Sequence, residues 1–170
     1  FFDSALGHRI ITLETTARRA FLDPDTEAAA YDLMSSGAIS DDRAALIQEF
    51  MDVNDLVAFD TSGALNTNFA FLSGLAEAEL FRMSEADILD QVYRQVEETR
   101  DSTEAWLRAY LTMAYQPLSN EELSDYIAFS ERPEGQRLNR ALFTGFGEMY
   151  DMQYRELSRS GARPLYSHDL

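Results

Sequence analysis

The chain has 170 residues, 45% of them hydrophobic, which is enough for the core of one domain. It carries 30 acidic residues against 14 basic ones, all of them Arg, so its formal charge is −16. Because phosphate backbones and anionic lipids bind clustered positive charge, this balance argues against nucleic acid and acidic membrane partners. The absence of Cys and Lys excludes disulfides, thiolate nucleophiles, Schiff bases and a P-loop lysine. No apolar run approaches the roughly 18 residues of a transmembrane segment.

Apolar residues recur with helical spacing along almost the whole chain, and no strand-like alternation persists. The sequence therefore predicts an all-α compact bundle of six or seven helices, in a single domain over residues 1–170. The first predicted helix covers about 4–22. Asp23 and Pro24 then suit an N-cap and a first helical position, and a second helix follows until Gly37 ends it.

The middle of the chain predicts two longer helical stretches. From an N-cap at Ser40 the apolar spacing continues to Leu72, with Gly63 inside it as a kink or a close helix contact. A further helix begins after Ser84 and continues to the region before Pro117, with an interruption at 100–102.

Two helices are predicted in the last third of the chain. Ser119 and Glu122 have the spacing of a capping box, which satisfies two backbone donors at a helix start. Pro133 begins the last helix, and Gly161 has the chemistry of the residue that ends it. The apolar residues of this helix are expected to face the core: Leu138, Leu142, Phe146, Met149, Tyr150, Tyr154 and Leu157.

Two segments of the sequence echo one another. Residues 1–10 match 129–138 without a gap, 128 positions apart. Such a match suggests a duplicated helix–turn–helix unit in which each Phe packs beneath its turn. The residues that carry this structural reading are Phe1, Gly7, Arg9, Phe129, Pro133, Gly135 and Arg137.

The second copy, Glu-Glu-Leu at 121–123 followed by Tyr-Ile-Ala-Phe-Ser-Glu-Arg-Pro-Glu-Gly-Gln-Arg-Leu at 126–138, resembles the bacterial domain-of-unknown-function family 2059. Arg132 stands where that family usually has a small residue. The motif region covers about 119–160, and residues 54–71 are similar to longer, two-copy members. The resemblance implies an all-helical fold and export to the periplasm, with no assigned activity. It also implies that the first copy is truncated at residue 1, so that a preceding helix and any signal peptide lie outside this chain.

A polar strip is the first candidate site. Asn54, Ser62 and Asn66 are spaced to lie on roughly one face of the long predicted helix. They either line a ligand groove or form an interhelical hydrogen-bond network that sets the register. Trp106, Tyr110 and Met113, on adjacent turns, either wall a pocket for an apolar ligand or a partner helix, or pack in the core.

Other polar residues do not combine into a recognisable centre. The acidic residues at 23–27 alternate as in a calcium loop, but the glycine and the bidentate glutamate of that loop are missing. The carboxylates at 97–101 either contribute ligands to a metal ion or form a solvated helix face. His8 is a lone imidazole, and a general base needs an oriented partner and a nucleophile. We expect no catalytic residue, no metal and no cofactor.

These observations favour a non-enzymatic, soluble helical interaction module of the bacterial cell envelope. Its partner is another protein or a second copy of itself. One alternative is a carrier of a small apolar ligand in a groove edged by Asn54, Asn66, Trp106 and Tyr110. The other is an enzyme that depends on carboxylates and a metal.

Overall fold

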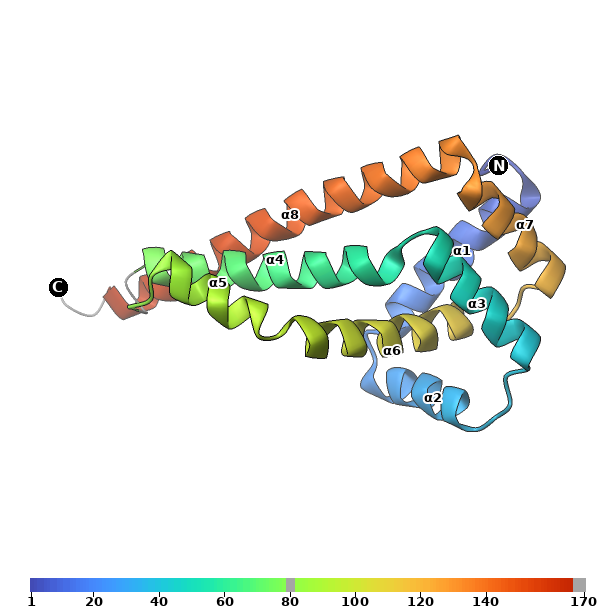
Figure 1. Cartoon of the computed structure of the whole chain (residues 1–170), viewed down its shortest axis with the longest axis horizontal. Helices are drawn as coiled ribbons and strands as arrows, with labels where there is room; N and C mark the ends of the chain where they lie inside the picture. Colours follow the sequence, from blue (N-terminus) through green and yellow to red (C-terminus); the bar gives the residue numbers. More distant parts are fainter. Residues whose placement is uncertain (79–81, 167–170) are drawn as a thin grey trace. The chain divides into compact units, whose positions relative to one another are not determined.

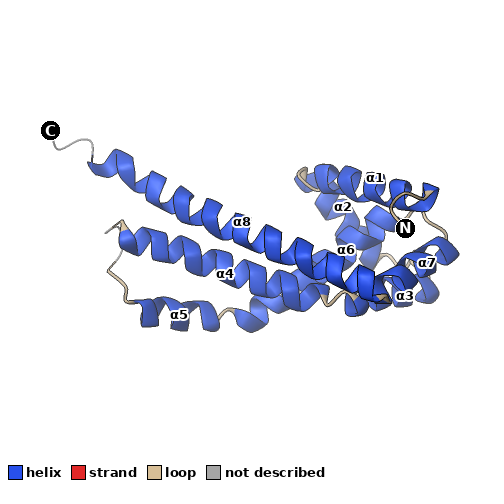
Figure 2. Cartoon of the chain, turned by 90° about the horizontal axis from the view of Figure 1, so that it is seen from above, coloured by secondary structure: helices blue, strands red, loops and turns tan. Residues whose placement is uncertain are grey.

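The computed structural model describes residues 1–78 and 82–166, and within these ranges it contains helices and no strand (Figures 1 and 2). The all-α prediction is confirmed. The predicted number of six or seven helices is wrong, because the described residues form eight. They are α1 (Ala5–Ala20), α2 (Pro24–Ser35), α3 (Asp41–Val53), α4 (Leu56–Glu77), α5 (Glu85–Tyr93), α6 (Val96–Tyr115), α7 (Asn120–Glu131) and α8 (Pro133–Tyr166).

The chain divides into two compact units. Unit 1 comprises Phe1–Val57 and Thr103–Asn139, and unit 2 comprises the described parts of Ala58–Ser102 and Arg140–Leu170. The helices α4, α6 and α8 each contribute residues to both units. The prediction that residues 1–170 form a single domain stays a prediction.

The predicted helix starts are confirmed by their capping geometry. The side chains of Asp23 and Ser40 accept backbone N–H groups at the starts of α2 and α3, and Pro24 occupies the first position of α2. Ser119 and Glu122 form the expected capping box at α7. A second capping box, not predicted, closes the start of α5 through Ser84 and Asp87.

The long helix predicted from Ser40 to Leu72 is two helices. The break lies at Asn54 and Asp55, and α4 then runs without interruption through Gly63. Asp55 has φ +52°, a left-handed conformation that ends a helix and that Asn and Asp tolerate better than other non-glycine residues. The dipeptide Asn-Asp was therefore the signal for this break, and Gly63 was not.

The predicted interruption at 100–102 is also wrong, because α6 is continuous there. The break instead separates Tyr93 from Val96. Gln95 lies in this gap, and its side-chain oxygen accepts a hydrogen bond from Asn68 of α4 at 2.9 Å. A contact between α4 and the link from α5 to α6 thus accompanies the break.

The last helix differs from its prediction in two ways. It continues past Gly161 and Pro164 to Tyr166. The residues expected to face the core are largely exposed, with Leu157 at 59% and Phe146 at 51%. The contacts of α8 with α4 run through other residues, Phe143, Arg155 and Ser158.

The core of unit 1 is well formed. Helices α3 and α7 pack against one another. The rings of Phe50 in α3 and Tyr126 in α7 both meet the ring of Tyr115 in α6, and the Tyr126 hydroxyl donates to Glu14 of α1. The most deeply buried large side chains here are Ile10, Ile47, Met51, Tyr115 and Leu123.

In unit 2, α4 and α8 lie side by side and run in the same direction (Figures 1 and 2). The rings of Phe59 and Phe143 stack with centroids 4.6 Å apart near the start of this pair. Farther along, Arg155 forms an ion pair with Glu77 at 2.8 Å. The two backbones approach so closely at Gly74 that a methyl group there would overlap the Ser158 hydroxyl.

Candidate functional site

Asn54 is buried and its side chain caps the end of α3. Its amide donates to the Phe50 carbonyl at 2.9 Å. Its own backbone carbonyl accepts from the Asn139 side chain at 2.8 Å, and Gln136 donates to the neighbouring Val53 carbonyl at 2.8 Å. Such contacts are expected where a polar residue takes part in a hydrogen-bond network between helices, which was one of the two interpretations of Asn54. They tie the start of α8 to the end of α3, and they use the side-chain N–H and the backbone carbonyl of Asn54.

The other groove candidates occupy different surroundings. Asn66 is exposed on α4 in unit 2, and Ser62 is exposed on the same helix. Trp106 and Tyr110 belong to unit 1, where their rings stack with centroids 5.0 Å apart. Phe21 of α1 meets both rings edge-on. The structure therefore brings the two aromatic residues together in a packed cluster.

A shallow hollow of about 370 Å³ lies between α2 and α6 in unit 1. Met113, predicted with Trp106 and Tyr110 to wall a pocket or pack in the core, is one of its lining residues. The four residues proposed for the groove, Asn54, Asn66, Trp106 and Tyr110, do not line it. Its walls are mostly small and apolar: Asp25, Thr26, Ala29, Ala30, Leu33 and Met113.

The two echo segments form equivalent turns. A methyl group at Gly7 would lie 2.5 Å from the Phe1 carbonyl oxygen and 2.6 Å from the Phe2 Cα. A methyl group at Gly135 would meet the matching atoms, the Phe129 carbonyl oxygen and the Ser130 Cα. In both places only glycine lets the helix start approach the preceding chain, which is the physical meaning of the matched glycines.

The arginines of the two echo segments have different partners. Arg9 binds the Glu122 carboxylate at 2.5 Å and also donates to the Pro117 carbonyl. Arg137 forms an ion pair with Glu134, within its own helix, at 3.3 Å. The equivalence is thus local to the turns, and a duplication of the whole unit is not shown.

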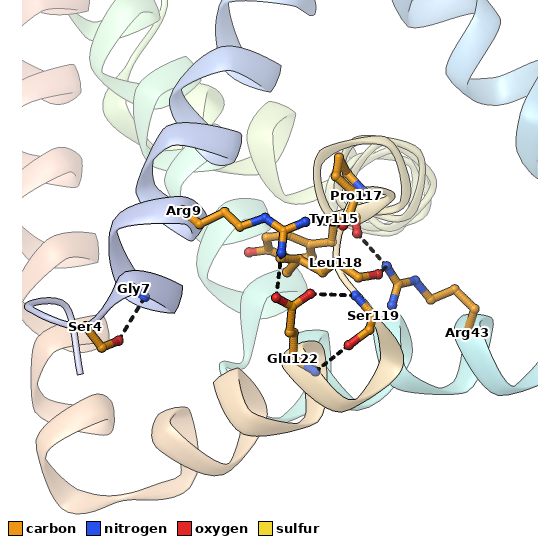
Figure 3. A network of polar contacts seen from close by, with 9 residues as sticks. All are labelled: Ser4, Gly7, Arg9, Arg43, Tyr115, Pro117, Leu118, Ser119 and Glu122. Carbon is orange, nitrogen blue, oxygen red and sulfur yellow. Dashed lines mark hydrogen bonds and ion pairs between the residues drawn. The ribbon is translucent and has the colours of Figure 1, made fainter.

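Figure 3 shows how Arg9 and a second arginine hold the turn between α6 and α7. Arg43 of α3 donates to the Tyr115 and Leu118 carbonyls at 2.5 and 2.8 Å, and to the Asn120 side chain at 3.0 Å. Arg9 of α1 reaches the same turn from the other side. The last carbonyl groups of a helix have no partner within the helix, so they need hydrogen-bond donors from elsewhere. The arginines therefore join α1 and α3 to this turn.

Glu14 is a partly buried carboxylate in α1 that the sequence analysis did not single out. Its carboxylate accepts hydrogen bonds from the hydroxyls of Tyr115 at 2.7 Å and Tyr126 at 3.2 Å. The Tyr110 hydroxyl donates to its backbone carbonyl at 3.0 Å. The signal was present, since Glu14 follows Ile10 by four residues and so interrupts the apolar face of the first helix.

Burial dominates the electrostatics of this cluster. Desolvation raises the pKa of Glu14 above its ordinary value, although the two tyrosine hydroxyls and nearby Arg18 lower it. Burial also raises the pKa of Tyr115 and Tyr126, and the Glu14 charge adds to this. The tyrosines therefore stay protonated as donors. The arrangement anchors α1 on α6 and α7, and none of its members lines the hollow between α2 and α6.

Among the described residues, unit 2 contains eight of the twelve large apolar side chains that are exposed. Twenty apolar side chains are buried among the described residues, and only Ala70, Ile88 and Val92 of these lie in unit 2. Yet α4 has only two charged residues among its 22. A helix that is apolar nearly all round is normally buried. Here many of its large side chains are only half-buried: Phe59, Leu65, Phe69, Phe71, Leu72 and Leu75.

Helix α8 adds an exposed stripe beside α4. The stripe consists of five side chains spaced by four, four, four and three residues, which places them on one helix face. Their exposed fractions range from 39% to 59%. The members of this α8 stripe are Leu142, Phe146, Tyr150, Tyr154 and Leu157.

No family model, curated protein or solved structure matches the chain. The resemblance to family 2059 therefore stays a hypothesis carried by the motif residues alone. Within residues 1–78 and 82–166, no group of three or more His, Asp or Glu side chains is placed to hold a metal ion. In the same ranges, no helix combines the length and hydrophobicity needed to span a membrane.

Proposed function

We propose that this chain is a helical interaction module of the bacterial cell envelope, and that it binds protein through the apolar surface of α4 and the α8 stripe. The observation that carries the proposal is the incomplete core of unit 2. Its helix α4 is the most apolar of the described helices, but few side chains of the unit are fully buried. The envelope location rests on the family resemblance.

The size of the surface supports this role. A large side chain has an area on the order of 200 Å², so exposed fractions of 39–59% leave roughly 500 Å² on the α8 stripe alone. Isolated proteins seldom expose apolar patches larger than a few hundred Å², and larger ones commonly mark interaction sites. The half-buried residues of α4 extend the patch.

The test is site-specific photo-cross-linking in the native host. A photoreactive phenylalanine analogue replaces Phe146 in one variant and Leu22 in another. Leu22 is 83% exposed in unit 1 and serves as the control. We expect a discrete cross-linked product from position 146 only, with the partner peptide identified by mass spectrometry. Equal labelling at both positions, or no product at 146, contradicts the proposal.

A further inference from the structure

The occupant of the unit 2 surface can be inferred from charge. We propose that it is a second copy of this chain, docked through α4 and the α8 stripe in a symmetric dimer. This inference rests on the proposed function, because it names the partner of the same surface.

Charge is distributed very unevenly along the chain. Helices α4 and α8 together carry six acidic residues and five arginines, so their net charge is −1. The remaining residues carry 24 acidic side chains and nine arginines, a net charge of −15. Like-charge repulsion between two copies is therefore weak along these two helices and stronger along most of the remaining chain, with the exception of α1, which has three arginines and one glutamate. The region of weak repulsion in unit 2 coincides with the apolar surface, which favours self-association there.

The geometry suits a symmetric contact. The α8 stripe extends over about 22 Å at 1.5 Å per residue, and a two-fold axis near its middle would place each stripe against its copy. In such an isologous interface each copy buries the same patch, so no apolar surface is left to recruit a third. A standard interface buries about 800 Å² per partner. The stripe supplies more than half of that area, and α4 lies next to it.

The first experiment is sedimentation velocity over a range of protein concentrations, with three proteins: wild type, Leu142→Glu and Leu22→Glu. The two variants make the same chemical change at exposed leucines, one in the stripe and one in unit 1. We expect a concentration-dependent dimer for wild type and Leu22→Glu, and at least tenfold weaker association for Leu142→Glu. A wild-type protein that stays monomeric at all concentrations overturns the proposal, as does an unaffected Leu142→Glu variant.

A second variant keeps the test decisive if Leu142→Glu folds poorly. The chain has no cysteine of its own, so Tyr150→Cys near the middle of the stripe introduces a single thiol. We expect oxidation to join two copies through this thiol, while Leu22→Cys stays largely monomeric. Equal cross-linking of both variants contradicts the contact.

The two proposals fail in different ways. A monomeric protein whose position 146 still cross-links to a different, identified protein overturns self-association and leaves the interaction module standing. A monomeric protein without any product at position 146 overturns both.

Discussion

The ring of Phe1 stacks on the ring of Phe129, with centroids 4.4 Å apart and planes 12° from parallel. These residues occupy the same position in the two echo segments. The ring of Phe2 meets the ring of Phe129 edge-on. The ring of Tyr126 stacks on the ring of Phe1, with centroids 5.4 Å apart. The two segments thus form one aromatic cluster in unit 1, which joins the start of α1 to the end of α7.

The glycines of these segments lead to the first prediction. Gly7→Ala and Gly135→Ala should each lower the free energy of unfolding by about 1–3 kcal/mol, because backbone atoms occupy the space that the methyl group needs. Gly145→Ala is the matched control. Its site on α8 is open, so the change should raise stability by up to about 1 kcal/mol through helix propensity. Chemical denaturation of the three variants measures these values. Equal effects at all three sites would show that the turns are not tight.

Glu14 predicts a specific dependence on pH. Its pKa is raised in the folded protein. At pH values between the unfolded and the folded pKa, the folded state therefore holds a proton that the unfolded state has released. This contribution to stability is complete below the unfolded pKa and is lost as pH rises through the folded value. Glu14→Gln keeps an acceptor for Tyr115 and Tyr126 without the charge. The melting temperature of the variant, relative to wild type, should therefore be higher at pH 7.5 than at pH 4.5. A relative melting temperature that falls with pH would mean that the tyrosines and Arg18 outweigh burial.

Arg43 predicts a loss of stability at the turn between α6 and α7. Arg43→Met keeps the apolar stem but removes donors to two carbonyls and to Asn120. We expect a loss of about 1–2 kcal/mol, since the site is partly solvated. Arg94→Met is the control, because its ion pair with Asp90 is exposed and lies within one helical turn. Urea denaturation compares them, and equal losses would contradict the role of Arg43.

Gly74 tests the contact between α4 and α8. Gly74→Ala should destabilise unit 2 by about 1–3 kcal/mol, because the new methyl group overlaps the Ser158 hydroxyl. Adding Ser158→Gly should restore part of the loss by removing that hydroxyl. Hydrogen exchange of the two helices is the measurement. If the double variant is less protected than Gly74→Ala, the close approach is not the cause.

Self-association should become stronger with salt. Two copies with a charge of −16 repel each other, and salt screens that repulsion while leaving apolar burial intact. Raising NaCl from about 0.05 M to about 0.5 M, where the Debye length is shorter, should lower the dissociation constant in sedimentation experiments. A dissociation constant that rises with salt would indicate attraction between opposite charges instead.

Local chemistry explains which predictions hold. The caps at Asp23, Ser40 and Ser119 and the helix start at Pro133 depend on hydrogen bonds and backbone angles within a few residues. The signal for the helix break at Asp55 was equally local, but the sequence analysis placed the possible kink at Gly63 instead. The exposed face of α8 could not be predicted, because periodicity shows which residues share a face and not whether another helix covers it.

The sequence by itself determined the all-α class, most helix starts, the matched turns at Gly7 and Gly135 and the uneven charge of the chain, since these depend on composition and near neighbours. The tertiary structure decided the rest. It brought Glu14 beneath three tyrosines of α6 and α7, placed two arginines on one turn, and left the α8 stripe uncovered. Each of these outcomes depends on residues about 70 or more positions apart, or on the absence of a neighbour, and no local pattern encodes either.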